Sequence, residues 1–177
     1  MDKVLVHMCC APCATWVCEK MRKEGFEPIF FFYNPNIFPK EEYDRRLENA
    51  LKLSKIMNFE LIVGEWDNEE WDSKIRGYEK EPEGGKRCKI CFEIRLRKTA
   101  EKCKELGIKK FTTTLTISPH KNAKVIFEVG ERIAKEYSLS FLSYDFKKED
   151  GFKKSVELSK KFSLYRQRYC GCKYSMR

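Results

Sequence analysis

Cysteine is the residue type whose placement in this sequence points most directly to chemistry. Seven of the nine cysteines fall into three short clusters. We call them the first cluster (Cys9, Cys10 and Cys13), the second cluster (Cys88 and Cys91) and the third cluster (Cys170 and Cys172). A C-x-x-C pair on a turn that leads into a helix can place both sulfurs on one metal centre. Because seven thiols exceed the four that a tetrahedral zinc or a 4Fe–4S cluster takes, the sequence predicts either two metal centres or additional redox thiols.

Two narrower interpretations of these thiols stay open at this point. Cys10 and Cys13 together with the second cluster would complete a structural zinc site of four thiolates. The CAPC segment is instead compatible with a redox dithiol, because a helix N-terminus lowers the pKa of a thiol. Neither interpretation uses the third cluster, where Gly171 allows a tight backbone path that brings both sulfurs to one metal.

The remaining sequence features indicate a protein of the reducing compartment. The odd number of cysteines argues against a disulfide framework, and the first residues carry no signal-peptide pattern. No apolar run is long enough to span a bilayer. We therefore expect a cytoplasmic protein with no membrane partner. Cys18 and Cys103 fall among apolar residues of predicted helices, so we expect both to pack in the core.

The charge balance favours a polyanionic partner. The chain has 36 Lys and Arg against 27 Asp and Glu, for a net charge of +9. Nucleic acid is the leading partner of this kind, although a lysine-rich solvated surface would give the same balance. Basic residues also flank the second and third clusters: Lys86, Arg87 and Lys89, and Arg166, Arg168 and Lys173. Their positive charges can balance the negative charge of several neighbouring thiolates. The basic residues of the tail can equally bind RNA phosphates.

Hydrophobic periodicity predicts five strands that alternate with helices. The predicted strands cover residues 3–8, 27–34, 59–66, 109–118 and 139–146. The predicted helices cover residues 14–25, 39–58, 91–107, 122–138 and 153–163. This alternation is typical of an α/β fold whose five-stranded, mainly parallel sheet carries helices on both faces. We expect one such domain over residues 1–177, with a cysteine-containing tail at 164–177. An insertion is expected at 67–90, with a loop at 83–88.

The predicted topology indicates where chemistry takes place. In open parallel sheets, ligands bind outside the carboxyl ends of the strands. The first cluster directly follows the first strand, so we expect its thiols in a cleft and not in the core. Tyr33, His120 and Asp145 lie at the carboxyl ends of three other predicted strands and are the candidate proton donors. His7 lies within the first strand and is expected to pack in the core.

Several motifs extend these features over nearly the whole chain. They are HMCCAPC, YNPNIFPKEEYDRR, RCKICFEIRLRKTA, FTTTLTISPHK, DFKK and YRQRYCGC, in this order from His7 to Cys172. Together they resemble the QueH family of epoxyqueuosine reductases. The resemblance implies a Rossmann-like fold of the nucleotide α-hydrolase type. It also implies an enzyme that converts epoxyqueuosine in tRNA to queuosine without cobalamin.

The resemblance further implies a 4Fe–4S cluster with an adjacent mononuclear iron. Removing the epoxide oxygen takes two electrons and two protons, whereas a cubane normally passes one electron at a time. A second iron could hold the other reducing equivalent and bind the epoxide oxygen as a Lewis acid. We favour the second cluster and two of the three N-terminal thiols on the 4Fe–4S cluster. The third cluster and the remaining N-terminal thiol would hold the lone iron. The sequence carries no nicotinamide or flavin fingerprint, so the electron donor is an external one of unknown identity.

Four arginines are candidate ligands for the tRNA substrate. Arg45 and Arg46 begin the helix after the second strand and can hold phosphate or the queuosine diol, unless they form a solvated helix face. Arg166 and Arg168 alternate with tyrosines in the tail, a pattern suited to an unpaired base and its phosphates. A modified anticodon base must leave its stack to reach a buried metal.

Two other functions remain as alternatives. An ATP-dependent tRNA-modification enzyme on the same kind of sheet needs a phosphate loop rich in glycine after the first strand. Here that loop reads CCAPCA, in which proline lacks an N–H and the sulfurs crowd the approach. A zinc-binding RNA module without catalytic activity is the second alternative, and the metal content of the protein distinguishes it from a reductase.

Overall fold

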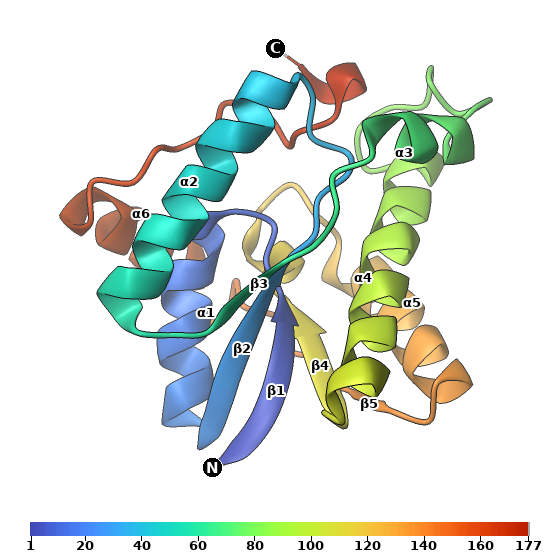
Figure 1. Ribbon diagram of the computed structural model, residues 1–177. Coiled ribbons are helices and arrows are strands. Elements are labelled where there is room, and N and C mark those ends of the chain that lie inside the picture. The colour runs from blue at the N-terminus through green and yellow to red at the C-terminus, as the bar shows by residue number, and fades with distance from the viewer. Residues whose placement is uncertain (177) are drawn as a thin grey trace.

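Five strands form one parallel sheet in the computed structural model, which describes residues 1–176. The strands are β1 (Asp2–His7), β2 (Phe26–Phe32), β3 (Leu61–Val63), β4 (Lys110–Thr113) and β5 (Ser140–Phe141). Their order across the sheet is β3-β2-β1-β4-β5, and each neighbouring pair is parallel (Figure 1). The expectation of a Rossmann-like α/β fold is confirmed.

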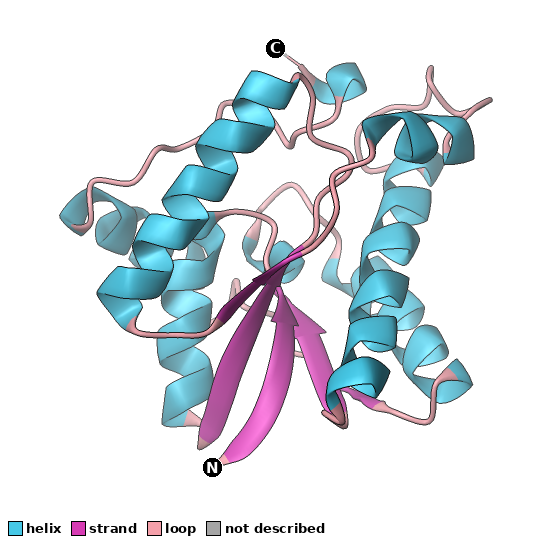
Figure 2. Ribbon diagram, in the orientation of Figure 1, coloured by secondary structure: helices cyan, strands magenta, loops and turns pink. Residues whose placement is uncertain are grey.

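Helices cover both faces of this sheet (Figures 1 and 2). They are α1 (Ala11–Lys23), α2 (Lys40–Met57), α3 (Asn68–Lys74), α4 (Lys86–Leu106), α5 (Ala123–Glu136) and α6 (Gly151–Lys161). Two short 3-10 turns, η1 (Thr114–Ile117) and η2 (Lys173–Ser175), lie after β4 and in the tail. Helices α1, α2 and α6 lie on one side of the sheet, and α4 and α5 lie on the other.

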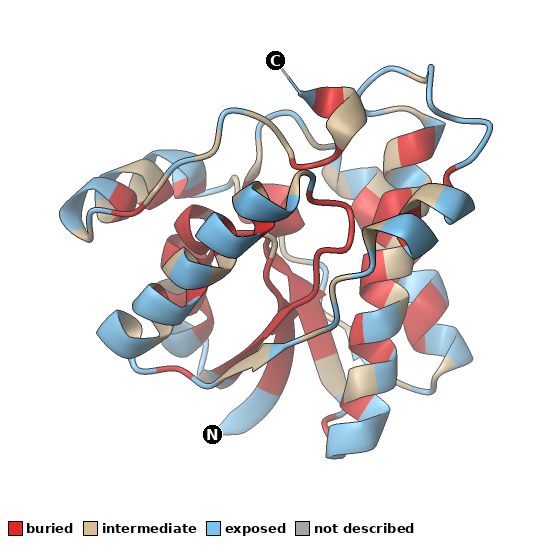
Figure 3. Ribbon diagram, turned by 45° about the horizontal axis from the view of Figure 1, so that its top comes forward, coloured by how far each residue is buried: buried red, intermediate tan, exposed pale blue. Residues whose placement is uncertain are grey.

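Two apolar cores sandwich the central strands (Figure 3). Val4 and Val6 of β1 pack into the core on the α1 side, whereas Leu5 between them packs into the core on the α4 side. The phenylalanines of β2 alternate in the same way. Because successive side chains of a strand point to opposite faces, a strand covered by helices on both sides is apolar throughout. This explains why the sequence shows unbroken hydrophobic runs here. Cys18 and Cys103 lie fully buried in the two cores, as expected.

The predicted strands were too long at their carboxyl ends. The strand expected over 109–118 stops at Thr113, because the Thr113 hydroxyl accepts the N–H of Leu115 at 3.1 Å and turns the chain into η1. The strand expected over 139–146 pairs only at Ser140–Phe141. Beyond it, the Thr116 hydroxyl donates to the carbonyl oxygen of Tyr144 at 2.9 Å in place of a strand–strand bond. Threonine hydroxyls therefore end the ladder earlier than the apolar pattern suggests.

The segment 67–90 contains more helix than expected. Asp67 caps α3 by accepting the N–H of Glu70 at 3.0 Å. The loop expected at 83–88 is wrong in its second half, because α4 already begins at Lys86. The N–H of Gly84 donates to Cys88 Sγ at 3.3 Å, so the cysteine satisfies a donor at the helix start. Arg177, the last residue of the expected tail, lies outside the described residues.

The strand order fixes the location of a ligand crevice. The chain proceeds outward from β1 through β2 to β3 and then returns to the other side of β1 as β4. In such sheets the crevice lies where the order reverses, outside the carboxyl ends of the two strands. Cys9 follows β1 and Thr114 follows β4, so these residues lie at the reversal. No helix within residues 1–176 is long and apolar enough to cross a membrane.

Substitution of Gly151 should loosen the packing of α6 on α1. A Cβ at this position would lie 1.7 Å from the backbone oxygen of Phe146 and 3.0 Å from Cδ1 of Trp16. We expect Gly151→Ala to lower the free energy of unfolding in urea by about 1–3 kcal/mol, because the backbone must move to relieve the overlap. Lys153→Ala, at an exposed position of the same helix, should change it by less than about 0.5 kcal/mol. Equal unfolding midpoints for the two variants would contradict the expectation.

Candidate metal centre

The first cluster lies where β1 passes into α1. Cys10 is the residue before the helix, in an extended conformation with φ −165° and ψ 163°, and Cys13 lies in the first helical turn. The bend between extended and helical backbone turns the sulfurs of Cys9, Cys10 and Cys13 toward one another, all within 4.8 Å. These three sulfurs could bind one metal ion, which a redox dithiol alone does not require.

A buried histidine supports the floor of this site. His7 Nε2 lies 3.0 Å from the carbonyl oxygen of Tyr33, and Nδ1 lies 2.9 Å from the hydroxyl of Thr113. Since a carbonyl oxygen only accepts, Nε2 donates and Nδ1 accepts from the hydroxyl. Burial, assisted by the charge of Arg95, lowers the pKa of His7 to about 3, so the ring is neutral. His7 therefore joins the ends of three strands, β2, β1 and β4, as the expected core residue.

Hydrogen bonds favour an ionised thiol at Cys9. The hydroxyl of Thr114 lies 3.1 Å from Cys9 Sγ and accepts the backbone N–H of Cys9 at 3.1 Å. Hydrogen bonds from Cys10 and Cys13 hold the pKa of the Cys9 thiol well below its ordinary value. The pKa of Cys13 is raised well above its ordinary value, chiefly because its hydrogen bonds to Cys10 and Cys9 favour the protonated form. Within the first cluster, the neighbouring thiols thus favour the ionised form at Cys9, and the ionised form is the one that binds metal.

The two cysteines of the second cluster, Cys88 and Cys91, lie one helical turn apart on α4. They face the third cluster. Cys91 and Cys172 are buried in a small apolar cluster with Trp71 and Ile75. Burial raises the pKa of Cys91, and the charge of Cys170 adds to this effect. Burial also raises the pKa of Cys88, where both tail cysteines contribute in the same direction. The second and third clusters therefore interact electrostatically although 78 or more residues separate them in the sequence.

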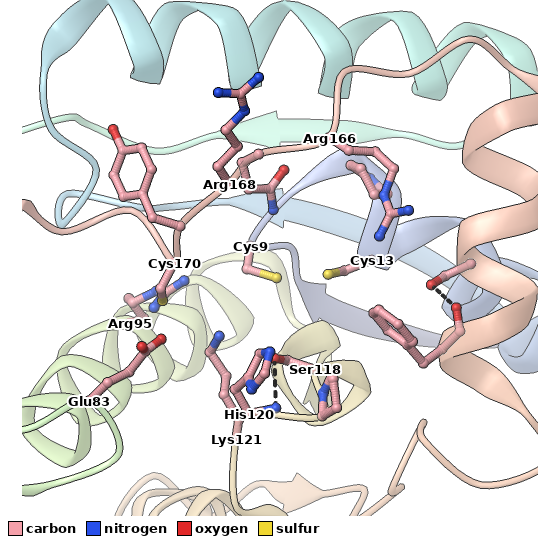
Figure 4. Close-up of a pocket in the computed structure, with 16 residues that line it drawn as sticks. Cys9, Cys13, Glu83, Arg95, Ser118, His120, Lys121, Arg166, Arg168 and Cys170 are labelled. Atoms are coloured by element: carbon pink, nitrogen blue, oxygen red, sulfur yellow. Dashed lines mark hydrogen bonds between the residues drawn. The ribbon is translucent and has the colours of Figure 1, made fainter. Parts of the chain in front are cut away.

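Cys170 connects the first cluster with the second. It lines the same cavity as Cys9 and Cys13, which has a volume of about 220 Å³, and the sulfurs of Cys9 and Cys13 point toward the same space (Figure 4). Cys170 interacts electrostatically with Cys9 as well as with Cys91. Cys170 therefore joins the first cluster at this cavity, whereas within residues 1–176 only the first cluster brings three sulfurs within 4.8 Å of one another.

Two cations, the buried Arg95 and the half-buried Lys121, accompany the sulfurs. Arg95 of α4, 1% exposed, donates to Cys91 Sγ at 3.5 Å and to the side-chain oxygen of Asn34 at 3.1 Å. Lys121, in the loop after η1, lies on the opposite wall of the cavity (Figure 4). Burial raises the pKa of Cys170, but Lys121 and Arg95 together outweigh this effect and leave the pKa below its ordinary value. Positive charge in the cavity wall therefore favours thiolates at the surface where a metal would bind.

The donors around the sulfurs fit a metal–sulfur group. Among the buried side-chain N–H groups of residues 1–176, Trp71 Nε1, Arg87 Nε and Arg95 Nε have no protein hydrogen-bond partner. Trp71 and Arg95 nevertheless interact with Cys91, and Gln167 interacts with Cys10. N–H groups directed at thiolates are the usual outer contacts of iron–sulfur clusters, whose sulfurs accept hydrogen bonds. Side-chain donors around Cys91 and Cys10 therefore fit a metal–sulfur group at this site.

The structure separates the three candidate proton donors. His120 lines the cavity beside Lys121 and is exposed. Tyr33 does not line it; its ring stacks on Phe31 against α4, and burial raises its pKa to about 12. Asp145 also lies outside the cavity lining and pairs with Lys147 at 3.3 Å. Geometry therefore favours His120, although the role of each candidate stays a prediction.

The four candidate substrate arginines also differ in position. Arg166 and Arg168 line the cavity and are exposed, and the guanidinium of Arg168 points away from the sulfurs (Figure 4). Arg45 is exposed on α2, with its guanidinium 4.8 Å from the ring centroid of Tyr165. Arg46 is only 2% exposed, and its guanidinium bonds to the chain itself. Arg46 thus supports the fold here, and the tail arginines are those open to a ligand.

Sequence reasoning did not single out Arg95, Lys121, Asn34 and Thr114. Arg95 lies seven residues after Cys88 on α4, which places it on the same helix face, and this spacing was the available signal. Asn34 lies two residues after the end of β2 and Thr114 directly follows β4, where side chains at the ligand-binding edge are expected. Lys121 gave no local signal, because its approach to the thiols depends on how the loop after η1 folds.

Comparison with known proteins gives consistent matches over the whole chain. A family model described as epoxyqueuosine reductase QueH matches residues 4–177. The epoxyqueuosine reductase QueH of Streptococcus pyogenes serotype M1 is 41% identical over 178 residues, covering 97% of this chain and 69% of that protein. The protein of the same name from Acinetobacter baylyi is 39% identical, with 99% and 81% covered. That from Thermotoga maritima is 37% identical, with 99% and 91% covered.

A double-mutant cycle on Asn34 and Arg95 tests the buried cation. Asn34→Leu should lower the free energy of unfolding of the metal-free protein by about 2–3 kcal/mol, because it removes an acceptor from a buried guanidinium. Arg95→Met should also destabilise, whereas the double variant should be more stable than the sum of the two effects. We expect a coupling energy of at least about 1 kcal/mol in urea unfolding. Additivity within about 0.5 kcal/mol would show that the contact contributes nothing specific.

Proposed function

The chain belongs to the QueH family of epoxyqueuosine reductases, and from this premise we propose that it reduces epoxyqueuosine in tRNA to queuosine. The reaction removes the epoxide oxygen as water and consumes two electrons and two protons. The observation that carries the proposal is that the three thiols of the first cluster lie together at the carboxyl edge of the sheet, with Cys170 of the tail in the same cavity. Such an enzyme would work in the cytoplasm, where tRNA is modified, and would take its electrons from a separate donor.

We assign the seven thiols to a 4Fe–4S cluster and an adjacent iron. Cys88 and Cys91, with two thiols of the first cluster, would hold the 4Fe–4S cluster. Cys170 and Cys172, with the remaining N-terminal thiol, would hold the single iron. The electrostatic contact of Cys170 with Cys9 and with Cys91 supports two centres that lie side by side. When bound, this group would supply the electrons and a Lewis acid for the epoxide oxygen.

Protein side chains would position the substrate and supply protons. The cavity of about 220 Å³ is smaller than a nucleotide, so it admits the reacting end of the modified base while the remainder lies at its mouth. His120 is exposed on the cavity wall and can deliver a proton to the departing oxygen. Lys121 next to it offers positive charge where negative charge develops.

The cavity mouth suits RNA. Arg166 and Arg168 line it and are exposed, and Tyr169 between the tail arginines and Cys170 provides an aromatic face. Phe152 of α6 adds a second aromatic ring at 40% exposure. Guanidinium groups next to aromatic rings bind the phosphates and stacked bases of unpaired nucleotides. This surface supports recognition of an anticodon loop whose modified base is turned outward.

Neither alternative accounts for the site as well. An ATP-dependent enzyme would use the N-terminus of α1 for phosphate, but Cys10, Cys13 and Pro12 occupy this turn. A structural zinc site would leave three of the seven convergent thiols without a function. The zinc-binding module nevertheless predicts a measurable outcome, a colourless protein with one equivalent of zinc.

Metal analysis tests the two-centre assignment. Protein purified without oxygen should be brown. Its sulfide content should match one 4Fe–4S cluster, and its iron content should exceed that of one 4Fe–4S cluster. The variant Cys170→Ser with Cys172→Ser should keep the cubane absorbance, lose about one iron and lose turnover of epoxyqueuosine-containing tRNA. Cys103→Ala is the matched control, because this cysteine is buried in the core away from the cavity, and it should keep both iron and turnover. Retained turnover in the double variant, or colourless wild-type protein with one zinc, would reject the assignment.

Salt dependence tests the RNA surface. Replacing Arg166 and Arg168 with alanine should weaken binding of an anticodon stem-loop and lower the slope of log K against log salt by about 1 per arginine. Arg132→Ala, on the exposed face of α5 where it pairs with Glu93, should leave the slope unchanged. Fluorescence anisotropy over a series of salt concentrations measures both. An unchanged slope in the double variant would remove the tail arginines from the RNA surface.

A further inference from the structure

The third cluster sits on a segment with little regular structure. Between the end of α6 at Lys161 and η2 at Lys173, the tail forms no helix or strand. It runs from α6 past α2 toward α3 and crosses the carboxyl edge of the sheet on its way (Figure 1). Since an irregular segment gains no order from its own backbone bonds, contacts with other elements must fix the position of Cys170.

One face of α2 supplies these contacts in sequence. Four polar residues of α2 spaced by four, three and three positions contact the tail: Glu42, Arg46, Asn49 and Lys52. Residues at this spacing lie on one side of a helix. Lys52 donates to the carbonyl oxygen of Ser163 at 3.0 Å, and Asn49 accepts the N–H of Tyr165 at 3.0 Å. The tail thus lies along α2 in a defined register.

Arg46 makes the contacts nearest to the thiols. Its Nη1 donates to the carbonyl oxygen of Cys170 at 2.8 Å, and its Nη2 donates to that of Tyr169 at 2.9 Å. Its Nε donates to Glu42 at 2.7 Å, and Glu42 also accepts the hydroxyl of Tyr165 at 2.8 Å. The guanidinium carbon lies 5.1 Å from the ring centroid of Tyr169. Each nitrogen of the guanidinium therefore has an acceptor within the chain, and because the side chain is only 2% exposed, Arg46 is not placed to bind an RNA phosphate.

Gly171 makes this close approach possible. Its φ of +144° lies in the region that favours glycine, and a Cβ there would lie 3.1 Å from both Arg46 Nη1 and Asn36 Nδ2. Its carbonyl oxygen accepts the N–H of Phe38 at 2.9 Å. On the other side of the bend, Asp72 of α3 accepts from Lys173 at 3.2 Å and from Tyr174 at 3.0 Å. The bend between the two cysteines is thus fixed at both ends.

We propose that Arg46 is a positioning residue that, paired with Glu42, holds the Cys170 segment so that its thiol meets those of the first and second clusters. The positioning depends on the fork shape of the guanidinium, because its two parallel donors bind two successive carbonyl oxygens at the same time. The inference rests on the proposed function only in one respect, namely that the third cluster serves the metal centre of a reductase. The contacts themselves require neither metal nor substrate.

Thiol labelling of the metal-free protein tests the proposal. Arg46→Lys keeps the positive charge but loses the fork, and Glu42→Gln keeps the arginine but loses its charged partner. Without oxygen and under native conditions, we expect Arg46→Lys to increase the rate of alkylation of Cys170 by iodoacetamide about tenfold, with a smaller increase for Glu42→Gln. Mass spectrometry of peptides measures each cysteine separately. Arg132→Lys, an exposed arginine in an ion pair on α5, is the matched control and should leave the rate unchanged.

The core cysteines distinguish positioning from general destabilisation. A variant that merely unfolds more often would expose Cys18 and Cys103 to the same extent as Cys170, since both lie in the cores. Selective labelling of the third cluster supports positioning. If all cysteines of Arg46→Lys are labelled faster, the variants Glu42→Gln and Gly171→Ala replace it. Labelling that is faster at the third cluster than at Cys18 and Cys103 in these variants then supports positioning, and equally faster labelling contradicts it.

Cobalt(II) provides a second readout that does not depend on activity. Thiolate-to-cobalt charge-transfer absorbance increases with the number of thiolates on the ion, so we expect a weaker band for Arg46→Lys than for wild type or Arg132→Lys. Wild-type labelling of Cys170 together with a wild-type cobalt spectrum in folded Arg46→Lys would overturn the proposal. A protein that binds cobalt as expected but does not reduce epoxyqueuosine would instead contradict the proposed function and leave the role of Arg46 supported.

Discussion

Thiolate charge gathered in a buried space requires positive charge in the same space, and much of this structure meets that requirement. Ionised sulfurs that lose their water are costly unless cations and N–H donors replace it. Arg95 reaches across from α4 to Cys91 and Asn34, and Lys121 closes the opposite wall. The order of the strands places both next to β1, because α4 precedes β4 and the loop after η1 follows it. The fold and the charge balance of the site are thus linked.

Much of the fold and part of the site follow from the sequence alone. Unbroken apolar runs predict central strands covered on both faces, and the first cluster directly after β1 predicts thiols at the ligand-binding edge. The gathering of all seven thiols stays a prediction from their number, since no single pair completes a centre for seven thiols. The predictions of the fold and of the place of the first cluster are confirmed because they depend on periodicity and on chain topology.

The parts that the sequence did not reveal depend on long-range side-chain contacts. Thr113 and Thr116 look like strand residues, yet their hydroxyls bond to backbone groups and end the ladder. Arg46 follows Arg45 in a helix that is polar on one side, and nothing local shows that one is buried and the other exposed. The difference arises from the tail, which packs over Arg46 from more than 120 residues further along the chain. Pairwise tertiary packing of this kind has no periodic signature.

The separation of the thiols along the chain has a consequence for biosynthesis. During synthesis the first cluster is made first, and its three sulfurs are fewer than the four that a cubane takes. The second cluster is complete 78 residues later, and Cys170 follows only after α6. A centre that used all three clusters would therefore be assembled only once α6 had been made, and iron delivered earlier would meet an unfinished ligand set.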